Sequence, residues 1–203
     1  MKLVKIFVVV TLSLSIFACA PIWQTRTTNN ISPELLADLR ADKIKQLTNW
    51  SLTGRTIITQ NKEAINVGLR WQEYDDHYQI KLEGPFSQGG VTLEGRAHHV
   101  TLATSDGKHA TATTPEQLIK NIVGWELPIS ALRDWTRGLP SLKQDISQAD
   151  YNDKGQLIHL VQHDWNIQFL RYIPFEDMEM PGKIFIKHPD LSMRLIISDW
   201  DRP

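Results

Sequence analysis

The sequence is poor in cysteine and in unbalanced charge, and both shortages restrict what the protein can be. One cysteine among 203 residues excludes an intramolecular disulfide. The 22 basic and 23 acidic side chains nearly cancel, so the chain lacks the basic surface that nucleic-acid binding requires. Hydrophobic residues make up 41% and charged residues 22%, which provides for a buried core and argues against global disorder.

Motifs of common catalytic sites are also missing. There is no G-x-S-x-G nucleophile elbow, and the segment 106–108 lacks the upstream glycine and the following Ser or Thr of a phosphate-binding loop. Glu73, Asp75 and Asp76 could supply a glycosidase pair, but carboxylates grouped in one hairpin turn are more often solvated. We therefore predict no enzyme activity and no catalytic residue.

The seven histidines are scattered along the chain. His98 and His99 would face opposite sides of a strand. His159 and His163 could share a strand face, but no third ligand stands at a motif spacing from them. We expect no metal site and no cofactor.

The first 18 residues are typical of a secretory signal peptide. Lys2 and Lys5 precede an apolar run from Ile6 to Phe17, and a small residue follows. At ~1.5 Å per residue this run is too short to cross a ~30 Å hydrocarbon core comfortably. A retained transmembrane helix is therefore the weaker alternative, and we assign residues 1–18 to a signal peptide.

The lone cysteine stands directly after this signal. Ile16-Phe17-Ala18-Cys19 resembles the lipobox of bacterial lipoproteins, which implies a diacylglycerol and an N-acyl group on Cys19 as the mature N-terminus. Ala20 follows rather than Asp, and by resemblance to sorted lipoproteins this implies the periplasmic face of the outer membrane of a Gram-negative bacterium. Cleavage after Ala20, which would remove Cys19, is the alternative. If Cys19 is lipidated, residues 19–31 form the lipidated N-terminus and a tether, and residues 32–203 form a single periplasmic domain.

Capping residues and apolar spacing predict helices in the remainder of the chain. Ser32 followed by Pro33 marks the start of a helix that extends to about Thr48. The segment 114–117 is a capping box for a second helix. A short third helix around Trp135 is closed by Gly138, with Pro140 as the stop.

Between these helices, apolar and polar residues alternate with the period of strands that bury one face. The predicted strands cover parts of 50–58, 65–71, 78–82, 91–93, 100–102, 157–161, 165–169, 183–187 and 191–198, with turns at 61–62, 75–76, 95–96, 153–155, 181–182 and 188–190. The pattern predicts a mainly β fold with helices, in which a long, curved antiparallel sheet has its concave face covered by the helices. Such a sheet can be filled solid or can enclose a ligand.

The segment from Gly124 to Pro140 resembles the signature of the LolB family. The matching positions are Gly124, Pro128, Leu132, Arg133, Trp135, Gly138, Leu139 and Pro140, and elsewhere Gly54, Trp71, Asp199 and Trp200. This resemblance spans most of the chain after the signal. It implies an incomplete antiparallel β-barrel, or half-barrel, with a helical lid over a hydrophobic cavity.

The resemblance also implies a function. It predicts an outer-membrane lipoprotein that accepts lipoproteins from the periplasmic carrier LolA and inserts them into the outer membrane by binding their acyl chains. The expected partners are a LolA-type carrier, lipoprotein acyl chains and the outer membrane, with no nucleic acid and with the chain as a monomer. An exposed family loop with an apolar tip, needed for the membrane-insertion step, aligns with Gly84–Gly90, and Phe86 falls where leucine is common. Folding of Phe86 back onto the sheet is the alternative.

Six residues are candidates for the acyl cavity because of their predicted inward faces. They are Leu69, Trp71, Leu82, Ile122, Leu132 and Trp135. Several of them could equally belong to an ordinary core. Two other functions stay open at this point: a binding or scaffold lipoprotein of the envelope, and a periplasmic hydrolase.

Overall fold

The computed structural model describes residues 31–84, 89–124, 126–142 and 144–203. Within these ranges the chain forms three helices and eleven strands, and all strand pairs are antiparallel. The helices are α1 (Pro33–Lys45), α2 (Pro115–Val123) and α3 (Ile129–Thr136). The strands are β1 (Trp50–Gln60), β2 (Glu63–Glu73), β3 (His77–Glu83), β4 (Gly90–Arg96), β5 (His99–Thr104), β6 (His109–Ala112), β7 (Ile146–Tyr151), β8 (Leu157–Gln162), β9 (Trp165–Phe175), β10 (Met178–His188) and β11 (Leu191–Asp201).

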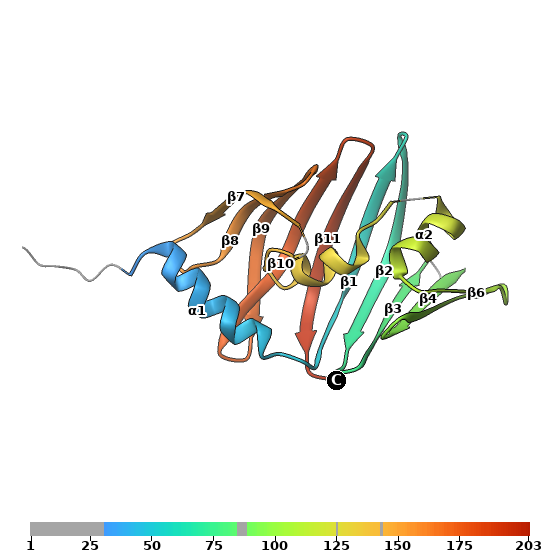
Figure 1. Ribbon diagram of the computed structural model, residues 1–203, viewed down its shortest axis with the longest axis horizontal. Coiled ribbons are helices and arrows are strands. Elements are labelled where there is room, and N and C mark those ends of the chain that lie inside the picture. The colour runs from blue at the N-terminus through green and yellow to red at the C-terminus, as the bar shows by residue number, and fades with distance from the viewer. Residues whose placement is uncertain (1–30, 85–88, 125, 143) are drawn as a thin grey trace, which may run out of the picture. The chain divides into compact units, whose positions relative to one another are not determined.

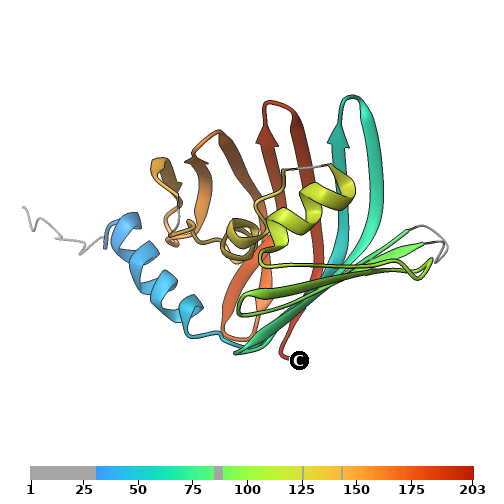
Figure 2. The same cartoon turned by 45° about the vertical axis from the view of Figure 1, so that its right-hand side comes forward.

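The strands form one open sheet built from two meanders. The order is β6-β5-β4-β3-β2-β1-β11-β10-β9-β8-β7. Every neighbouring pair is consecutive in sequence except β1 and β11, and the consecutive strands β6 and β7 lie at opposite edges of the sheet. Among the described residues the edge strands β6 and β7 do not pair, which confirms the predicted mainly β, incomplete antiparallel barrel as an unclosed sheet. Both ribbon views show the sheet curved, with α2 and α3 lying on one of its faces (Figures 1 and 2).

Helices α1 and α2 begin at the capping residues that the sequence predicted. The Ser32 Oγ atom accepts a hydrogen bond from the Leu35 N–H at 3.2 Å at the start of α1. The Thr114 Oγ1 atom accepts one from the Gln117 N–H at 3.3 Å at the start of α2. Gly124, in the left-handed region at φ 78°, ends α2 as a C-cap that needs no Cβ.

One predicted turn lies two residues away from its expected place. Gly95 and Arg96 belong to β4 rather than to a turn, and the reversal occurs at Ala97 and His98. His98 adopts the left-handed region with φ 59°. The prediction was wrong because glycine was taken as a turn residue, whereas Gly95 lies within the sheet and leaves room for the ring of Tyr78 on the neighbouring strand.

A second predicted turn, at Pro181-Gly182, is also wrong. Both residues lie inside β10, where the register with β9 shifts after Pro181. Proline has no N–H for the ladder, so it produces an irregularity in the strand instead of ending it. A Cβ on Gly182 would lie 2.6 Å from the Cγ2 atom of Ile173 on β9. Glycine, which has no Cβ, avoids this clash.

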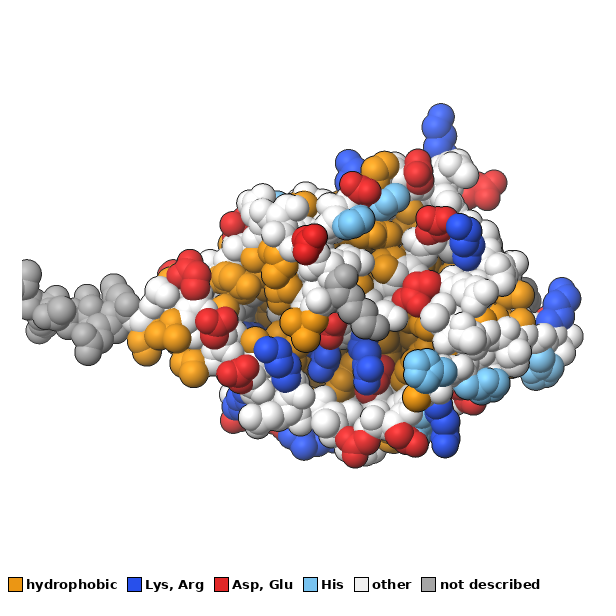
Figure 3. Space-filling view, viewed as in Figure 1, with side chains coloured by type: hydrophobic (Ala, Val, Ile, Leu, Met, Phe, Trp, Pro, Cys, Tyr) orange, Lys and Arg blue, Asp and Glu red, His pale blue; other side chains and the backbone are white. Residues whose placement is uncertain are grey.

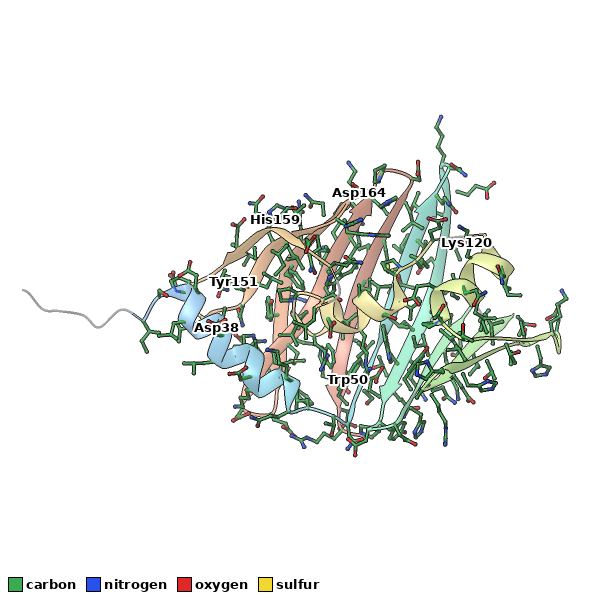
Figure 4. All side chains as sticks on the ribbon, in the orientation of Figure 1. Asp38, Trp50, Lys120, Tyr151, His159 and Asp164 are labelled. Carbon is green, nitrogen blue, oxygen red and sulfur yellow. The ribbon has the colours of Figure 1, made fainter. Side chains whose placement is uncertain are left out.

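Helix α1 packs at the β7 end of the sheet. The Arg40 guanidinium lies 5.4 Å from the ring centroid of Tyr172 on β9. A Cβ on Gly155, which has φ 68°, would lie 2.4 Å from the carbonyl carbon of Leu36, so glycine is what allows this close approach. Figure 4 shows Asp38 of α1 and Tyr151 of β7 on this side of the sheet.

A buried glutamine ties α3 and the loop after it to the sheet. The Trp135 Nε1–H donates to Gln162 Oε1 at 2.8 Å, and both side chains are fully buried. The same oxygen accepts the Ser141 N–H at 2.8 Å, while Gln162 Nε2 donates to the carbonyls of Ser141 and Gln144, each at 2.9 Å. Every polar atom of the glutamine is therefore satisfied in the core.

Among the residues that the structure describes, no helix combines the length and the apolar character needed to cross a bilayer.

Candidate functional site

Three neighbouring strands present matched rows of side chains on the concave face of the sheet. The cross-strand register defines an aliphatic row, a middle row and a polar row, which lie about 7 Å apart because two residues separate them along each strand. The rows are Leu69–Leu82–Val91, Trp71–Ile80–Leu93 and Glu73–Tyr78–Gly95. The concave face thus changes from apolar to polar in the same direction on β2 and β3, while β4 has Gly95, which carries no side chain, at the corresponding position.

The aliphatic and middle rows form one wall of an apolar cavity of about 70 Å³. The helical segment supplies the opposite wall, and among the described lining residues Thr56 is the single polar side chain. The lining consists of Thr56, Ile58, Leu69, Trp71, Ile80, Leu82, Val91, Leu93, Met193 and Leu195 from the sheet, with Ile119, Leu127, Ile129 and Leu132 from the helical segment.

Four of the six predicted cavity residues line this cavity, namely Leu69, Trp71, Leu82 and Leu132. The other two lie elsewhere. Ile122 is 50% exposed in the last turn of α2, although it follows the buried Leu118 and Ile119 by about one helical turn. Trp135 packs in the core with its ring centroid 5.7 Å from that of Trp165.

The two helices that face the sheet are joined by a hydrogen bond. The Glu116 Oε1 atom on α2 accepts the Ser130 N–H in the first turn of α3 at 2.7 Å. Pro128, the N-cap residue of α3, makes no side-chain capping bond, so Glu116 supplies both an acceptor and a favourable charge at this helix N-terminus. That α2 and α3 act as a lid stays a prediction.

A polar cleft of about 650 Å³ continues from the apolar cavity, and the two share Trp71 and Ile129. The polar row lies on the sheet side of this cleft, and the polar residues of α3 lie opposite. The residues that line it and carry charge are Glu73, Asp75, Asp76, Arg96, Arg133, Asp134 and Arg137. Figure 3 shows side chains of both charges and histidines around the β3–β6 end of the sheet.

Glu73 is completely buried at the boundary between cavity and cleft. Its Oε1 atom accepts the Trp71 Nε1–H at 3.0 Å, and its Oε2 atom forms an ion pair with the guanidinium of Arg133 on α3. Burial raises the pKa of Glu73, because desolvation of the carboxylate outweighs the charge of Arg133 and the Trp71 hydrogen bond. The ion pair therefore links α3 to β2 without fully compensating the buried charge.

Tyr78 occupies the centre of the polar row. Its ring lies over Gly95, where a Cβ would be 2.2 Å from the Tyr78 Cζ atom, so only glycine leaves room for it. The Tyr78 Oη atom is buried and has no hydrogen-bond partner among the described residues. Burial raises the pKa of this phenol well above its usual value, so the group is a neutral donor.

The sequence did not single out Glu73 or Tyr78 as binding residues. Glu73 was grouped with the turn carboxylates Asp75 and Asp76, although it shares the alternation of Leu69 and Trp71 and therefore points inward. The inward alternation of Tyr78 with Ile80 is the signal that could have identified it. Cys19 and Phe86, the predicted lipidation and membrane-insertion residues, lie outside the described residues.

Histidines in the described ranges do not cluster with other metal ligands. The His159 Nδ1 atom lies 3.3 Å from Asp150 Oδ2 on the neighbouring strand, and no group of three His, Cys, Asp or Glu residues within these ranges could hold a metal ion. His159 therefore has one carboxylate partner and no further ligand.

The chain is similar in sequence to one protein family over most of its length. Residues 48–200 match the family model described as "Outer membrane lipoprotein LolB". A protein named outer-membrane lipoprotein LolB from Nitrosococcus oceani is 32% identical over 200 residues, covering 98% of both chains. A protein of the same name from Cellvibrio japonicus is 34% identical over 169 residues, covering 80% of this chain and 83% of its own.

Solved structures share the fold at low sequence identity. A LolA superfamily protein from Nitrosomonas europaea superposes with a TM-score of 0.51 at 7% identity, covering 85% of this chain and 94% of its own. A DUF1329 family protein from Desulfovibrio piger superposes with a TM-score of 0.56 at 6% identity, with the same coverage. At these identities the likeness concerns the open sheet and its helices alone.

Proposed function

The chain belongs to the LolB family of outer-membrane lipoproteins, and from this premise we propose that it accepts lipoproteins from a LolA-type carrier and inserts them into the outer membrane by binding their acyl chains. Its localisation at the outer membrane follows from the family, which is a family of lipoprotein receptors and not of enzymes. The observation that carries the proposal is the apolar cavity between the concave face and the helical segment.

The energetic problem that such a protein solves is the exposure of hydrocarbon to water. Moving an acyl chain from lipid into water costs about 0.8 kcal/mol per methylene, so two or three long chains amount to roughly 25–35 kcal/mol. A carrier must keep these chains in an apolar environment at every step. Because the sequence has no nucleotide-binding motif, each transfer runs downhill on affinity, from carrier to this protein and then to the bilayer.

In this proposal the cavity must expand before it binds acyl chains. A volume of about 70 Å³ holds roughly two water molecules, whereas pockets that enclose a small-molecule ligand measure ~300–1,000 Å³. Acyl chains therefore enter only when α2 and the residues leading to α3 move away from the sheet. The aliphatic and middle rows, held in the sheet ladder, supply the fixed wall of the expanded cavity.

The lipid anchor keeps the protein at the outer membrane, and the segment between β3 and β4 helps to release the cargo into that membrane. A diacylglycerol and an N-acyl group on Cys19 hold the protein at the outer membrane, and the tether of residues 19–31 lets the domain reach both carrier and bilayer. Phe86, which falls between β3 and β4 in the sequence, enters the membrane interface and brings the aliphatic end of the concave face to lipid, since Leu82 and Val91 lie at the ends of the strands before and after it.

A reconstituted transfer assay tests this function. The chain with Cys19→Ala is mixed with purified, lipoprotein-loaded LolA-type carrier, and the cargo is followed first onto the chain and then into liposomes. We expect the cargo to leave the carrier and reach the bilayer. Retention of all cargo by the carrier would overturn the proposal and would favour a scaffold role.

The loop is tested separately in the same assay. Phe86→Glu is expected to accept cargo normally and to lose most insertion into liposomes, because a carboxylate does not enter the interface. Phe86→Leu, which keeps an apolar tip, is the matched control. Normal insertion by Phe86→Glu would remove the role assigned to this loop.

A further inference from the structure

The polar cleft adjoins the apolar cavity in the way that the head of an amphiphile adjoins its tail. On the sheet side, Glu73 on β2 and Tyr78 on β3 follow the middle row after one step of about 7 Å, beside Gly95 of β4. On the helix side, α3 shows the same change, because Leu132 faces the cavity while Ser130 and Arg133 face the cleft. Both walls change polarity at the same level, where Trp71 and Ile129 belong to both spaces.

The donors in the cleft suit neutral carbonyl oxygens. Tyr78 Oη carries a proton that no described residue accepts, although a buried hydroxyl normally has a partner. Arg133, with 46% of its side chain exposed, keeps guanidinium N–H groups available beyond the one that contacts Glu73. Tyr78 and Arg133 both line the cleft, so they are the candidate donors for an ester or amide carbonyl bound there.

The charges of the cleft argue against a phosphate group. Each of its three guanidinium groups already has a carboxylate partner: Arg133 with Glu73, Arg137 with Asp134 at 2.8 Å, and Arg96 with Asp76 at 3.8 Å. Asp75 adds a fourth carboxylate to the lining. An anion entering the cleft would therefore meet neutralised cations and an excess acidic group, whereas an uncharged head would not.

We propose that this cleft binds the uncharged polar head of the cargo, the ester and amide carbonyls of an acylated glyceryl-cysteine, while its acyl chains occupy the adjoining cavity. The proposal rests on the acyl-binding function above and adds the site of the head. A cleft volume of about 650 Å³ falls in the range that encloses small ligands, ~300–1,000 Å³. Tyr78 and Arg133 are the residues that bind the head.

This site gives the cargo a fixed direction. With its head held at the Glu73–Tyr78–Gly95 row, the chains extend along the strands past Ile80 toward the aliphatic row. The aliphatic row borders the turn between β3 and β4, so the chains point toward that end of the sheet and the head toward the opposite end. A protein that delivers to a bilayer from the β3–β4 end would therefore release its cargo tails first.

Tyr78→Phe is the decisive variant, because it removes one hydroxyl that has no hydrogen-bond partner among the described residues. The chain with Cys19→Ala is loaded with the apolar fluorophore N-phenyl-1-naphthylamine, which is displaced by a synthetic triacylated glyceryl-cysteine peptide. We expect Tyr78→Phe to require about 3- to 10-fold more lipopeptide for half displacement, the loss of one neutral hydrogen bond. The fluorophore, which has no carbonyl head, should bind both forms alike, and the thermal midpoint should be unchanged or higher.

Two further variants separate the head site from general effects. Tyr74→Phe, at a tyrosine that stacks on His77 but does not line the cleft, should behave as the parent. Arg133→Lys keeps a positive charge near Glu73 but loses the planar guanidinium fork, so it should also weaken lipopeptide displacement.

The outcomes distinguish the two proposals. Equal lipopeptide displacement from the parent and Tyr78→Phe would overturn the head site while leaving acyl binding intact. Phosphatidylglycerol that displaces the fluorophore as well as the lipopeptide does, with the same sensitivity to Tyr78→Phe, would assign the cleft to phospholipid instead. Failure of both fluorophore and lipopeptide to bind the parent would overturn the acyl-binding function, and the head site with it.

Discussion

The indole N–H of Trp71 donates to the buried carboxylate of Glu73 at 3.0 Å, and this bond joins the wall of the apolar cavity to the polar cleft. Trp71 presents its ring to the cavity, whereas Glu73 pairs with Arg133 on α3. A polar atom at the edge of a hydrocarbon site is costly unless it is paired. The hydrogen bond and the ion pair together allow the concave face to change polarity within two residues.

The raised pKa of Glu73 predicts a pH dependence of stability. An acid whose pKa is raised on folding stabilises the protein below the pKa of the unfolded chain and loses that contribution as pH rises through the folded pKa. Glu73→Gln does not titrate. Its free energy of unfolding relative to the parent should therefore increase between about pH 4 and about pH 8, measured by urea unfolding followed by tryptophan fluorescence.

The control for this experiment is Glu63→Gln, an exposed glutamate of the same strand. It removes one exposed carboxylate from β2 and so measures the effect of losing a surface charge on this strand. A constant difference between Glu73→Gln and the parent would show that the folded and unfolded chains bind the Glu73 proton equally.

Gly54 lies in β1 where this strand pairs with β11 and joins the two meanders, and its substitution should be severe. A Cβ there would lie 2.1 Å from the Ile196 carbonyl oxygen on β11, where the β1–β11 register shifts after Thr53. Because backbone cannot move aside as a side chain can, we expect Gly54→Ala to lose about 3 kcal/mol of unfolding free energy or more. Chemical denaturation measures this loss.

Gly68→Ala on β2 is the matched control for Gly54→Ala. The nearest atom to a Cβ at Gly68, the Glu83 carbonyl oxygen, is at an ordinary 3.6 Å. Its expected change is within about 1 kcal/mol and could be stabilising, since alanine restricts the unfolded chain. Equal losses at the two glycines would contradict the close approach of β1 and β11.

The sequence predicted features that depend on neighbouring residues, such as the starts of helices, but it did not predict which distant strands pair. The helix starts at Ser32 and Thr114 follow from a side-chain oxygen near free N–H groups, which depends on a few neighbouring residues. The pairing of β1 with β11 joins residues such as Leu52 and Trp200, which no periodicity can relate. The edge strands β6 and β7 were missed because their short, largely polar sequences show no apolar alternation.

The candidate site was predicted in part for the same reason. Alternation within β2 and β3 placed Leu69, Trp71 and Leu82 on the inner face, where the structure has them. Ile122 shares the helical spacing of the buried Leu118 and Ile119, but it lies in the last turn of α2 and is exposed, which the spacing does not show. The pairing of Glu73 with Arg133 requires the packing of α3 on β2, and spacing alone could not reveal it.

Gln162 is expected to be among the most sensitive polar residues of the core. Gln162→Met keeps a similar length but removes the acceptor for the Trp135 Nε1–H and the Ser141 N–H, and the donor to the Ser141 and Gln144 carbonyls. Each buried polar group left unpaired costs about 1–3 kcal/mol, so a total loss of about 3 kcal/mol or more is expected in urea unfolding. Gln148→Met, on the exposed edge strand β7, should stay within about 0.5 kcal/mol of the parent, and a similar result for Gln162→Met would contradict the burial of this network.

The cavity itself predicts a trade-off between stability and binding at Val91. Val91→Leu adds one methylene to the lining of a space of about 70 Å³, so the form with this small cavity should gain about 0.8 kcal/mol. The expanded, ligand-bound form does not need that methylene, so the equilibrium shifts against binding by a similar amount, about fourfold in affinity. Fluorescence titration with N-phenyl-1-naphthylamine and thermal unfolding measure the two effects, and Val161→Leu on β8, away from the cavity, controls for a general change in packing. Higher stability with unchanged probe affinity would mean that the probe binds somewhere other than between the concave face and the helices.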